Sequence, residues 1–301
     1  MRPALISIEG VTKDFGLTRA LDNVSFDVVT GELHAICGEN GAGKSTLMKI
    51  LSGVITEYEG TLAVDGAPVA FQGTRDAESM GISIIHQELN LMPHLNVAQN
   101  IFIGREPKSK NRIFLNDAEL NRMAKELLDE LNLKIDPTTI VGELTIARQQ
   151  MVEIAKAVSY RGEVIIMDEP TSSLTPSETQ ALFNIIRDLK KRNMGIIYIS
   201  HRLEELDAIA DRITVIRDGE FIKTLNARET NIDEIISLMV GRQVGHDQRP
   251  TPRKLSGNTV LKVENFSTKF LLKDVSFELK EGEILGFAGL MGSGRTELAR
   301  A

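Results

Sequence analysis

One glycine-rich stretch constrains the fold of this chain more than any other: it reads Gly38-Glu39-Asn40-Gly41-Ala42-Gly43-Lys44-Ser45, with Thr46 behind it. The stretch fits the pattern Gly-x-x-x-x-Gly-Lys-Ser/Thr. An apolar run at residues 33–37 precedes it, and a helix-prone run at 45–51 follows it. Glycines let the backbone curl so that successive N–H groups point at phosphate oxygens beside a helix N-terminus. The stretch therefore predicts a strand, a phosphate-binding loop and a helix, with Lys44 reaching the β- and γ-phosphates and Ser45 ligating Mg²⁺.

Short apolar runs alternate with stretches of helical period along the chain, which predicts an α/β fold. Four runs are apolar at nearly every residue, as strands buried on both sheet faces tend to be; they lie at 33–37, 82–86, 164–167 and 195–200. The Asp-Gly pairs at 65–66 and 218–219 predict hairpin turns. The clearest helix is expected at 117–131, with Asn116 and Glu119 forming its N-terminal cap.

The composition excludes several classes of protein. Of the 301 residues, 42% are hydrophobic and 26% are charged, as expected of a soluble globular chain. A formal net charge of -7 argues against a surface that coats nucleic acid. No apolar run approaches the ~20 residues that a membrane-spanning helix needs. The single cysteine, Cys37, excludes an internal disulfide, so a reducing compartment such as the cytoplasm fits.

The chain contains a partial internal repeat. Val24-Ser25-Phe26 recurs as Val275-Ser276-Phe277, Gly31-Glu32 recurs as Gly282-Glu283, and Gly38 corresponds to Gly289. All three pairs lie 251 residues apart, which indicates a duplicated domain. Residues 241–257 hold prolines, glycines and charges without apolar periodicity, which is typical of a linker. We therefore expect a first domain at 4–240, a linker at 241–257, and the beginning of a second, incomplete domain at 258–301.

Polar side chains follow three of the expected strands. Asp168 and Glu169 follow the run at 164–167, His201 follows the run that begins at Gly195, and Gln87 follows the run at 82–86. In open α/β sheets nucleotides bind at the carboxyl ends of the strands. There one carboxylate can hold Mg²⁺ through water while another deprotonates an attacking water, an imidazole can sense a γ-phosphate, and an amide can join the Mg²⁺ shell. Each residue alone also fits an ordinary strand end, and the glycine-rich loop favours the catalytic interpretation.

Together these motifs resemble the ATP-binding-cassette ATPases, and in detail their sugar-import branch, whose ATPase is one polypeptide with two fused cassettes. The resemblance covers the whole chain, and a full family member would continue past Ala301. The matching stretches are the loop that ends in Lys44-Ser45-Thr46, His86-Gln87-Glu88, residues 149–157, residues 236–242, and a second glycine-rich loop at 289–296.

The resemblance implies ATP and Mg²⁺ as cofactors and gives each site residue a role. It implies that Phe15 stacks on adenine, Asp168 holds Mg²⁺ through water, and Glu169 is the general base. His201 is implied to contact the γ-phosphate, and Gln87 to couple the nucleotide to a membrane subunit. The implied nucleotide-binding residues are Phe15, Gly38, Glu39, Asn40, Gly41, Ala42, Gly43, Lys44, Ser45 and Thr46. The implied metal ligands are Ser45, Gln87 and Asp168, and the implied catalytic residues are Lys44, Gln87, Glu169 and His201.

The resemblance also implies a fold and partners. The fold is a P-loop NTPase: a RecA-like core with an antiparallel β subdomain and a helical subdomain at about 90–160. The implied function is ATP hydrolysis that powers import of a sugar, with a monosaccharide as cargo, through an integral-membrane permease and, indirectly, an extracytoplasmic sugar-binding protein. The chain would be peripheral at the cytoplasmic face of the cell membrane. It would pair with a second cassette in the same polypeptide or, at this length, with a second copy, and no nucleic-acid partner is expected.

Two positions depart from the family pattern in a way that bears on activity. The expected Leu-Ser-Gly-Gly-Gln reads Leu144-Thr145-Ile146-Ala147-Arg148. The Cβ of Ala147 could obstruct the approach of backbone N–H groups to a phosphate held by another cassette, and the charge of Arg148 could compensate. Arg295 replaces the lysine of the second loop, and its planar fork is not equivalent to an ammonium. In a head-to-tail pair both changes fall on one composite site, which predicts an asymmetric ATPase whose Lys44 site turns over.

A third departure has a structural explanation. Thr175 stands where the family usually has Asp, and Thr175-Pro176-Ser177-Glu178 is a capping box with proline at the first helical position. We therefore expect Thr175 to cap a helix that continues through residues 181–189.

A second class of function stays open, namely a soluble tandem cassette protein that acts as a nucleotide switch on ribosomes or nucleic acid. Such proteins usually join their cassettes by a long charged helical linker. The linker expected here is short and contains prolines, which favours transport. A GTPase is disfavoured because Asn-Lys-x-Asp does not occur in the chain.

Overall fold

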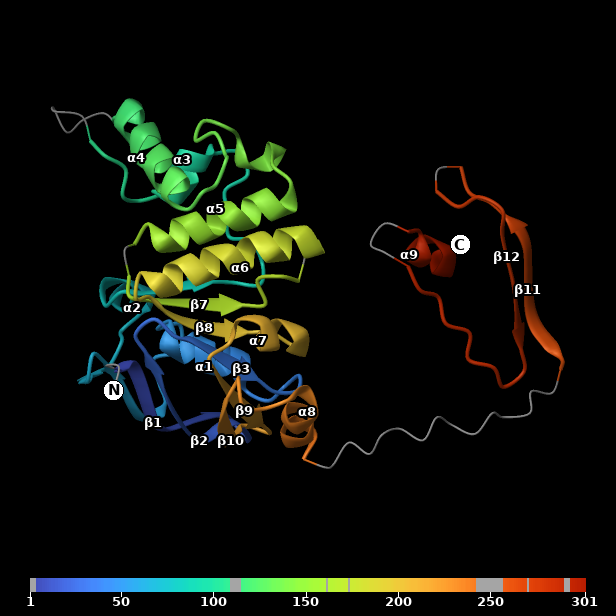
Figure 1. Ribbon diagram of the computed structural model, residues 1–301, viewed down its shortest axis with the longest axis horizontal. Coiled ribbons are helices and arrows are strands. Elements are labelled where there is room, and N and C mark those ends of the chain that lie inside the picture. Colours follow the sequence, from blue (N-terminus) through green and yellow to red (C-terminus); the bar gives the residue numbers. More distant parts are fainter. Residues whose placement is uncertain are drawn as a thin grey trace. The chain divides into compact units, whose positions relative to one another are not determined.

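The computed structural model describes residues 4–108, 115–160, 162–172, 174–241, 257–269, 271–289 and 293–301. The chain divides into two compact units, residues 1–244 and 245–301. The larger unit is built on one extended sheet with helices packed against it (Figure 1). Its strands are β1 (Ala4–Phe15), β2 (Thr18–Val29), β3 (Leu33–Cys37), β4 (Glu59–Val64), β5 (Ala67–Val69), β6 (Ile82–Ile85), β7 (Val164–Asp168), β8 (Gly195–Ile199), β9 (Arg212–Arg217) and β10 (Glu220–Asn226).

The helices of the larger unit fall between these strands. In chain order they are α1 (Lys44–Leu51), α2 (Thr74–Ser79), α3 (Val97–Ile101), α4 (Asp117–Glu130), the 3-10 helix η1 (Val141–Glu143), α5 (Ile146–Val158), α6 (Pro176–Lys191), α7 (Leu203–Ile209) and α8 (Ile232–Val240). In Figure 1, α5 and α6 lie over β7 and β8, and α3 and α4 lie beyond α5.

The ten strands follow the order β5-β4-β1-β2-β10-β9-β3-β8-β7-β6. Parallel pairing links β9, β3, β8, β7 and β6, which form the α/β core. Antiparallel pairing links β1, β2, β4 and β5. The two parts join where Glu220 of β10 pairs with Asp22 of β2. The expected antiparallel subdomain is therefore an extension of the core sheet rather than a separate sheet.

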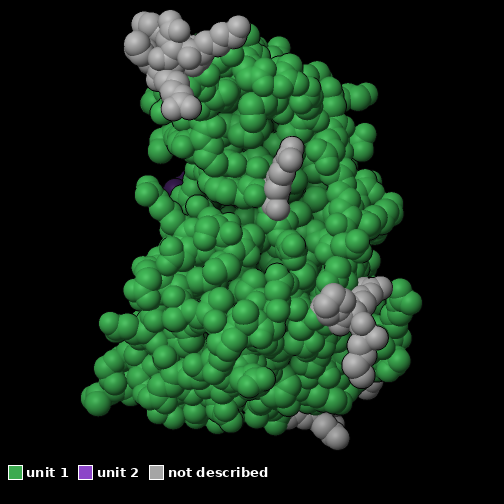
Figure 2. All heavy atoms as spheres, turned by 90° about the vertical axis from the view of Figure 1, so that its left-hand side faces the viewer, with its two compact units in different colours: residues 1–244 green, residues 245–301 purple. Residues whose placement is uncertain are grey.

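Two hydrophobic cores lie on opposite faces of the parallel strands, because successive side chains of a strand point to opposite sides. Ile165 and Met167 of β7 join the core formed with α3 to α8. Ile166 of β7 and Ile197 and Ile199 of β8 join the core formed with α1, β1 and β2. Both faces are thus buried, which explains the continuous apolar runs of the sequence. Figure 2 shows one outer face of the larger unit, coloured green.

The sequence predictions of local structure are confirmed, with shifts of one residue at some ends. The four expected strands are β3, β6, β7 and β8, and β6 ends one residue before His86. The two Asp-Gly pairs connect β4 to β5 and β9 to β10, and Asp65 (φ 49°) and Asp218 (φ 52°) take the left-handed conformation of such turns. Asn116 accepts a hydrogen bond from the N–H of Glu119 at the start of α4.

The capping box at the start of α6 is also confirmed. The side chain of Thr175 accepts a hydrogen bond from the N–H of Glu178, and the carboxylate of Glu178 accepts one from the N–H of Thr175 at 2.8 Å. Pro176 occupies the first turn, as the sequence pattern indicated.

The smaller unit repeats hydrogen bonds of the larger one. It contains β11 (Thr259–Phe266), β12 (Val275–Lys280) and α9 (Arg295–Arg300) among its described residues. The carboxylate of Glu32 accepts a hydrogen bond from the N–H of Val29 at 2.9 Å, and Glu283 accepts one from Lys280 at 2.8 Å, with both partners 251 residues further along. Gly43 before α1 (φ 98°) and Gly294 before α9 (φ 88°) share the left-handed conformation. Residues 242–256 of the expected linker and 290–292 of the second loop lie outside the described residues.

We expect the buried His34 of β3 to make the stability of the larger unit depend on pH. It is fully buried, with Nε2 2.7 Å from Oγ1 of Thr214, and burial lowers its pKa to about 4. The unfolded chain therefore takes up this proton first as the pH falls from 6.5 toward 4, so the folded state loses up to about 3 kcal/mol of stability in that window.

Urea unfolding at several pH values measures this loss of stability. His34→Asn should abolish this part of the acid loss and His94→Asn, at an exposed position, should keep it; an unchanged acid loss in His34→Asn would contradict the assignment.

Thr175 should contribute to stability through its cap alone. We expect Thr175→Ala to lower the free energy of unfolding by about 1 kcal/mol, because the first turn of α6 loses its side-chain acceptor. Thr175→Ser and Thr175→Asp keep an acceptor and should remain within about 0.5 kcal/mol of the unchanged chain. Urea denaturation measures the difference, and an alanine variant as stable as the serine variant would show that the cap is dispensable.

Candidate nucleotide site

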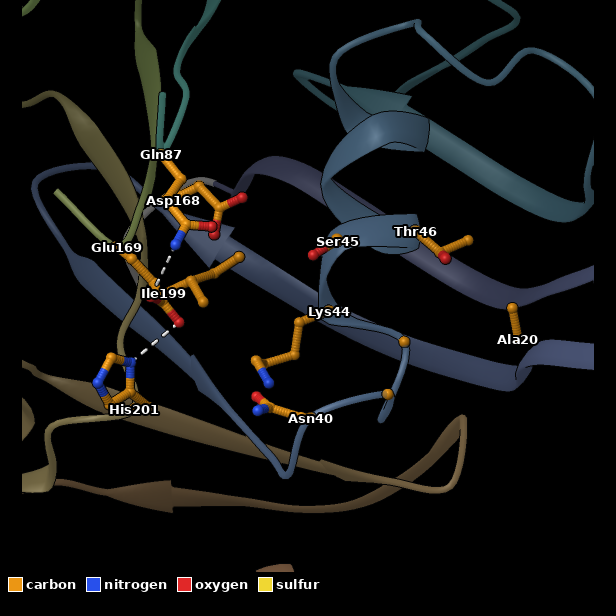
Figure 3. A pocket seen from close by; sticks show the side chains of 12 residues that line it. Ala20, Asn40, Lys44, Ser45, Thr46, Gln87, Asp168, Glu169, Ile199 and His201 are labelled. Atoms are coloured by element: carbon orange, nitrogen blue, oxygen red, sulfur yellow. Dashed lines mark hydrogen bonds and ion pairs between the residues drawn. The ribbon is translucent and has the colours of Figure 1, made fainter. Parts of the chain in front are cut away.

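A cavity of about 590 Å³ lies at the carboxyl ends of β3, β7 and β8. Residues from the loop before α1 and from the first turn of α1 form one side of it, and residues at or just after the ends of β6, β7 and β8 form the other (Figure 3). The lining residues are Ala20, Asn40, Gly41, Gly43, Lys44, Ser45, Thr46, Gln87, Asp168, Glu169, Ile199 and His201.

Two glycines of the loop are required by close backbone contacts. A Cβ on Gly38 would lie 2.2 Å from the carbonyl oxygen of Ile216. A Cβ on Gly43 would lie 2.5 Å from the carbonyl oxygen of Ala20, and Gly43 has a φ of 98°, where side chains are strained. The loop is therefore pressed against β2 and β9, and α1 begins directly after it.

Lys44 is buried and held by the loop itself. Its Nζ donates hydrogen bonds to the carbonyl oxygens of Gly38 at 2.8 Å and Glu39 at 3.0 Å. Burial lowers the pKa of Lys44, while the carboxylate of Glu169 acts in the opposite direction. The ammonium thus lies inside the cavity wall with two neutral carbonyl acceptors.

Asp168 ends β7 on the opposite side of the cavity. Burial raises the pKa of this carboxyl, and the neighbouring charge of Glu169 raises it further. A cation placed beside Asp168 would therefore relieve an unfavourable local charge.

Glu169 is held through both its backbone and its side chain. It has a φ of 46°, which a residue with its side chain rarely adopts, and its N–H donates to the carbonyl oxygen of Ile199 at 3.0 Å. Gln87 Nε2 donates to Oε2 of Glu169 at 3.4 Å, and Nδ1 of His201 lies 3.0 Å from Oε1. Figure 3 shows the carboxylate between these two side chains. Three residues that are far apart in the sequence thus meet at one carboxylate.

Four residues of the expected binding set do not line the cavity. The carbonyl groups of Gly38 and Glu39 hold Lys44, and Ala42 is buried. Phe15 ends β1 with half of its surface exposed, and Nζ of Lys13 lies 5.3 Å from its ring centre. Ala20 and Ile199 also line the cavity, and no motif indicated them, because their position depends on how the strands meet.

The segment at 144–148 forms the start of α5. Thr145 caps α5 by accepting a hydrogen bond from the N–H of Arg148 at 3.4 Å. Ala147 is 7% exposed, so its methyl group is covered by the protein, and Ile146 is 51% exposed at the helix start. That the Cβ of Ala147 obstructs another cassette stays a prediction; within this chain the start of α5 turns Ala147 inward and leaves Ile146 at the surface.

The donor set around the cavity fits Mg²⁺. Ser45 offers a hydroxyl, Gln87 an amide oxygen and Asp168 a carboxylate, and Mg²⁺ prefers oxygen ligands and keeps several waters. Among the described residues no three His, Cys, Asp or Glu side chains converge as an all-protein metal cage. The chemistry therefore suits a metal shared with phosphate oxygens, which is the usual mode for Mg²⁺.

The described residues include no helix whose length and apolar character would let it cross a bilayer.

Comparison with solved structures finds a nucleotide-free ATP-binding cassette from an ABC transporter, with a TM-score of 0.68 and 25% identity over 79% of this chain and 95% of that one.

Two curated relatives match almost the whole chain. The "Putative ribose/galactose/methyl galactoside import ATP-binding protein 2" of Burkholderia cenocepacia is 53% identical over 99% of this chain. The ribose import ATP-binding protein RbsA of Geobacillus kaustophilus is 47% identical over 99% of it. The chain spans 58% and 60% of the length of these two relatives.

A family model described as ABC transporter matches residues 21–172, which include the phosphate-binding loop, α5, and the carboxylates of Asp168 and Glu169 at the end of β7. The chain therefore belongs to the ABC transporter family.

Proposed function

We propose that this chain binds ATP with Mg²⁺ and hydrolyses it to power import of a sugar through a membrane permease. One observation carries the hydrolytic part: the loop that holds Lys44 faces Asp168, Glu169 and His201 across a single cavity. An anion-binding loop opposite two carboxylates suits a phosphate ester whose charge is shared with a metal ion.

The loop and α1 would bind the phosphates. Backbone N–H groups between Gly41 and Thr46 surround the start of α1, where the helix dipole also favours an anion. Lys44 would exchange its carbonyl acceptors for phosphate oxygens. Ser45, Asp168 and Gln87 would hold Mg²⁺, which when bound neutralises charge on the phosphates. Phe15, half exposed at the end of β1, would stack on adenine.

Glu169 would act as the general base. Its carboxylate would take a proton from water as the water oxygen bonds to the γ-phosphorus, and the bond to the β–γ bridging oxygen would break to release ADP. Gln87 and His201 contact the two carboxylate oxygens and so hold the base in place. His201 would also contact the γ-phosphate, and Lys44 would stabilise the charge that develops there.

The relatives' names support the transport role. Both are named as import ATP-binding proteins, one for ribose and the other for ribose, galactose and methyl galactoside. We propose that the permease is an integral-membrane partner, that the chain lies peripherally at the cytoplasmic face, and that a sugar-binding protein acts outside the membrane. We also propose that residues 4–240 form one cassette and 258–301 begin a second, which the repeated hydrogen bonds support.

Replacing the general base should separate binding from hydrolysis. We expect Glu169→Gln to lower the ATP hydrolysis rate between about 100-fold and 10,000-fold, because the amide cannot accept the proton. ATP affinity should stay within about threefold, since the loop is untouched. Phosphate release and equilibrium binding of ATP measure the two quantities. Glu220→Gln, at an exposed position of β10, is the matched control; hydrolysis by Glu169→Gln at the control's rate would exclude Glu169 as the base.

The transport role predicts a membrane partner. Affinity purification of the tagged chain from detergent-solubilised membranes of its source cells should recover a polytopic membrane protein, and sedimentation of a cell extract should leave the chain out of the ribosome fraction. Recovery with ribosomes and without a membrane protein would favour the nucleotide-switch alternative.

A further inference from the structure

A buried carboxylate outside the cavity joins the loops that carry Glu169 and His201. Glu205 lies in the first turn of α7 and is 6% exposed. It accepts hydrogen bonds from the hydroxyls of Thr171 at 2.7 Å, Tyr198 at 2.9 Å and Ser200 at 2.9 Å, and from the guanidinium of Arg202 at 3.2 Å. A carboxylate is stable in such a place only when its oxygens are satisfied, and here donors from three segments satisfy them.

Three of the four donors stand beside proposed catalytic residues. Thr171 follows Glu169 by two residues, and Ser200 and Arg202 flank His201. The N–H of Arg202 also donates to the hydroxyl of Ser200 at 3.0 Å, which closes the bend at His201. Glu205 therefore restrains both loops from one point.

The strained backbone of Glu169 explains why this restraint is needed. A residue with a side chain is strained at a φ of 46°, and this conformation persists only where the surroundings hold it. The N–H of Glu169 is tied to Ile199, and Thr171 accepts a hydrogen bond from the N–H of Leu174 at 3.1 Å through its carbonyl group. The bond from the Thr171 hydroxyl to Glu205 completes the set that fixes this turn.

Tyr198, which belongs to β8, donates its hydrogen bond to the same carboxylate. Burial raises the pKa of its phenol, and Glu205 raises it further, so the group stays a neutral donor. Because Tyr198 belongs to the strand rather than to either loop, it offers a control that alters the carboxylate's environment while leaving both loop contacts in place.

We propose that Glu205 is a positioning residue whose carboxylate fixes Glu169 relative to His201 and so sets the rate of ATP hydrolysis. It acts through Thr171, Ser200 and Arg202 and lines no part of the nucleotide cavity. The inference rests on the proposed hydrolysis of ATP by this chain.

The first test separates turnover from binding. Glu205→Gln and Thr171→Val should each lower kcat on the order of 100-fold, because a displaced general base loses its alignment, with the KM for ATP within about threefold. Thr171→Ser should restore the rate. Glu204→Gln removes a charge from the exposed neighbouring residue, and Tyr198→Phe removes a donor outside both loops; both should keep the rate within about threefold.

The second test does not need turnover. Amide hydrogen exchange of Glu169 and Arg202 in the unliganded chain should be about tenfold faster in Glu205→Gln and Thr171→Val, and unchanged in Glu204→Gln. If the chain without substitutions fails to hydrolyse ATP, the proposed function is contradicted. The amide hydrogen exchange rates would still decide the role of Glu205. Unchanged exchange, or an unchanged kcat in Thr171→Val, would overturn the inference, and Thr171→Val remains informative should Glu205→Gln fail to fold.

Discussion

The parallel pairing of β8 with β3 on one side and with β7 on the other is the constraint on which the rest of the structure depends. It brings three carboxyl strand ends to one edge, so that the loop with Lys44, the carboxylates at the end of β7 and His201 after β8 border one cavity. The pairing is stable because side chains on both faces enter large hydrophobic cores. The order of the strands therefore places these residues together, although they are far apart in the sequence.

Much of this arrangement could be predicted from the sequence, because its signals are local. Strands buried on both faces read as continuous apolar runs, and glycines that must avoid a Cβ clash stand in a recognisable pattern, as Gly38 and Gly43 show. The left-handed φ of Glu169 and the hydrogen bonds to Glu205 could not be predicted, since both depend on segments that meet only in three dimensions. The inward turn of Ala147 was also missed, because the phase of a helix is set by its packing.

The fold places two ionisable groups of the site where burial disfavours their charged forms. Burial lowers the pKa of Lys44 and raises that of Asp168, so each charged form is disfavoured by its surroundings. A phosphate beside Lys44 and a cation beside Asp168 would each favour the charged form. Ligand binding would therefore gain free energy from groups that the fold leaves unfavourably placed. Gln87, His201 and the hydrogen bonds at Glu205 would meanwhile hold Glu169 in position for proton transfer.

We propose that Glu169 activates water for attack on the γ-phosphorus of ATP held by the loop of Lys44. Hydrolysis in ¹⁸O-labelled water, followed by mass spectrometry of the products, tests it most directly. Attack at the γ-phosphorus places the label in inorganic phosphate and none in ADP. Label in ADP, or formation of products at the same rate when Lys44 is replaced by Ala, would contradict the account.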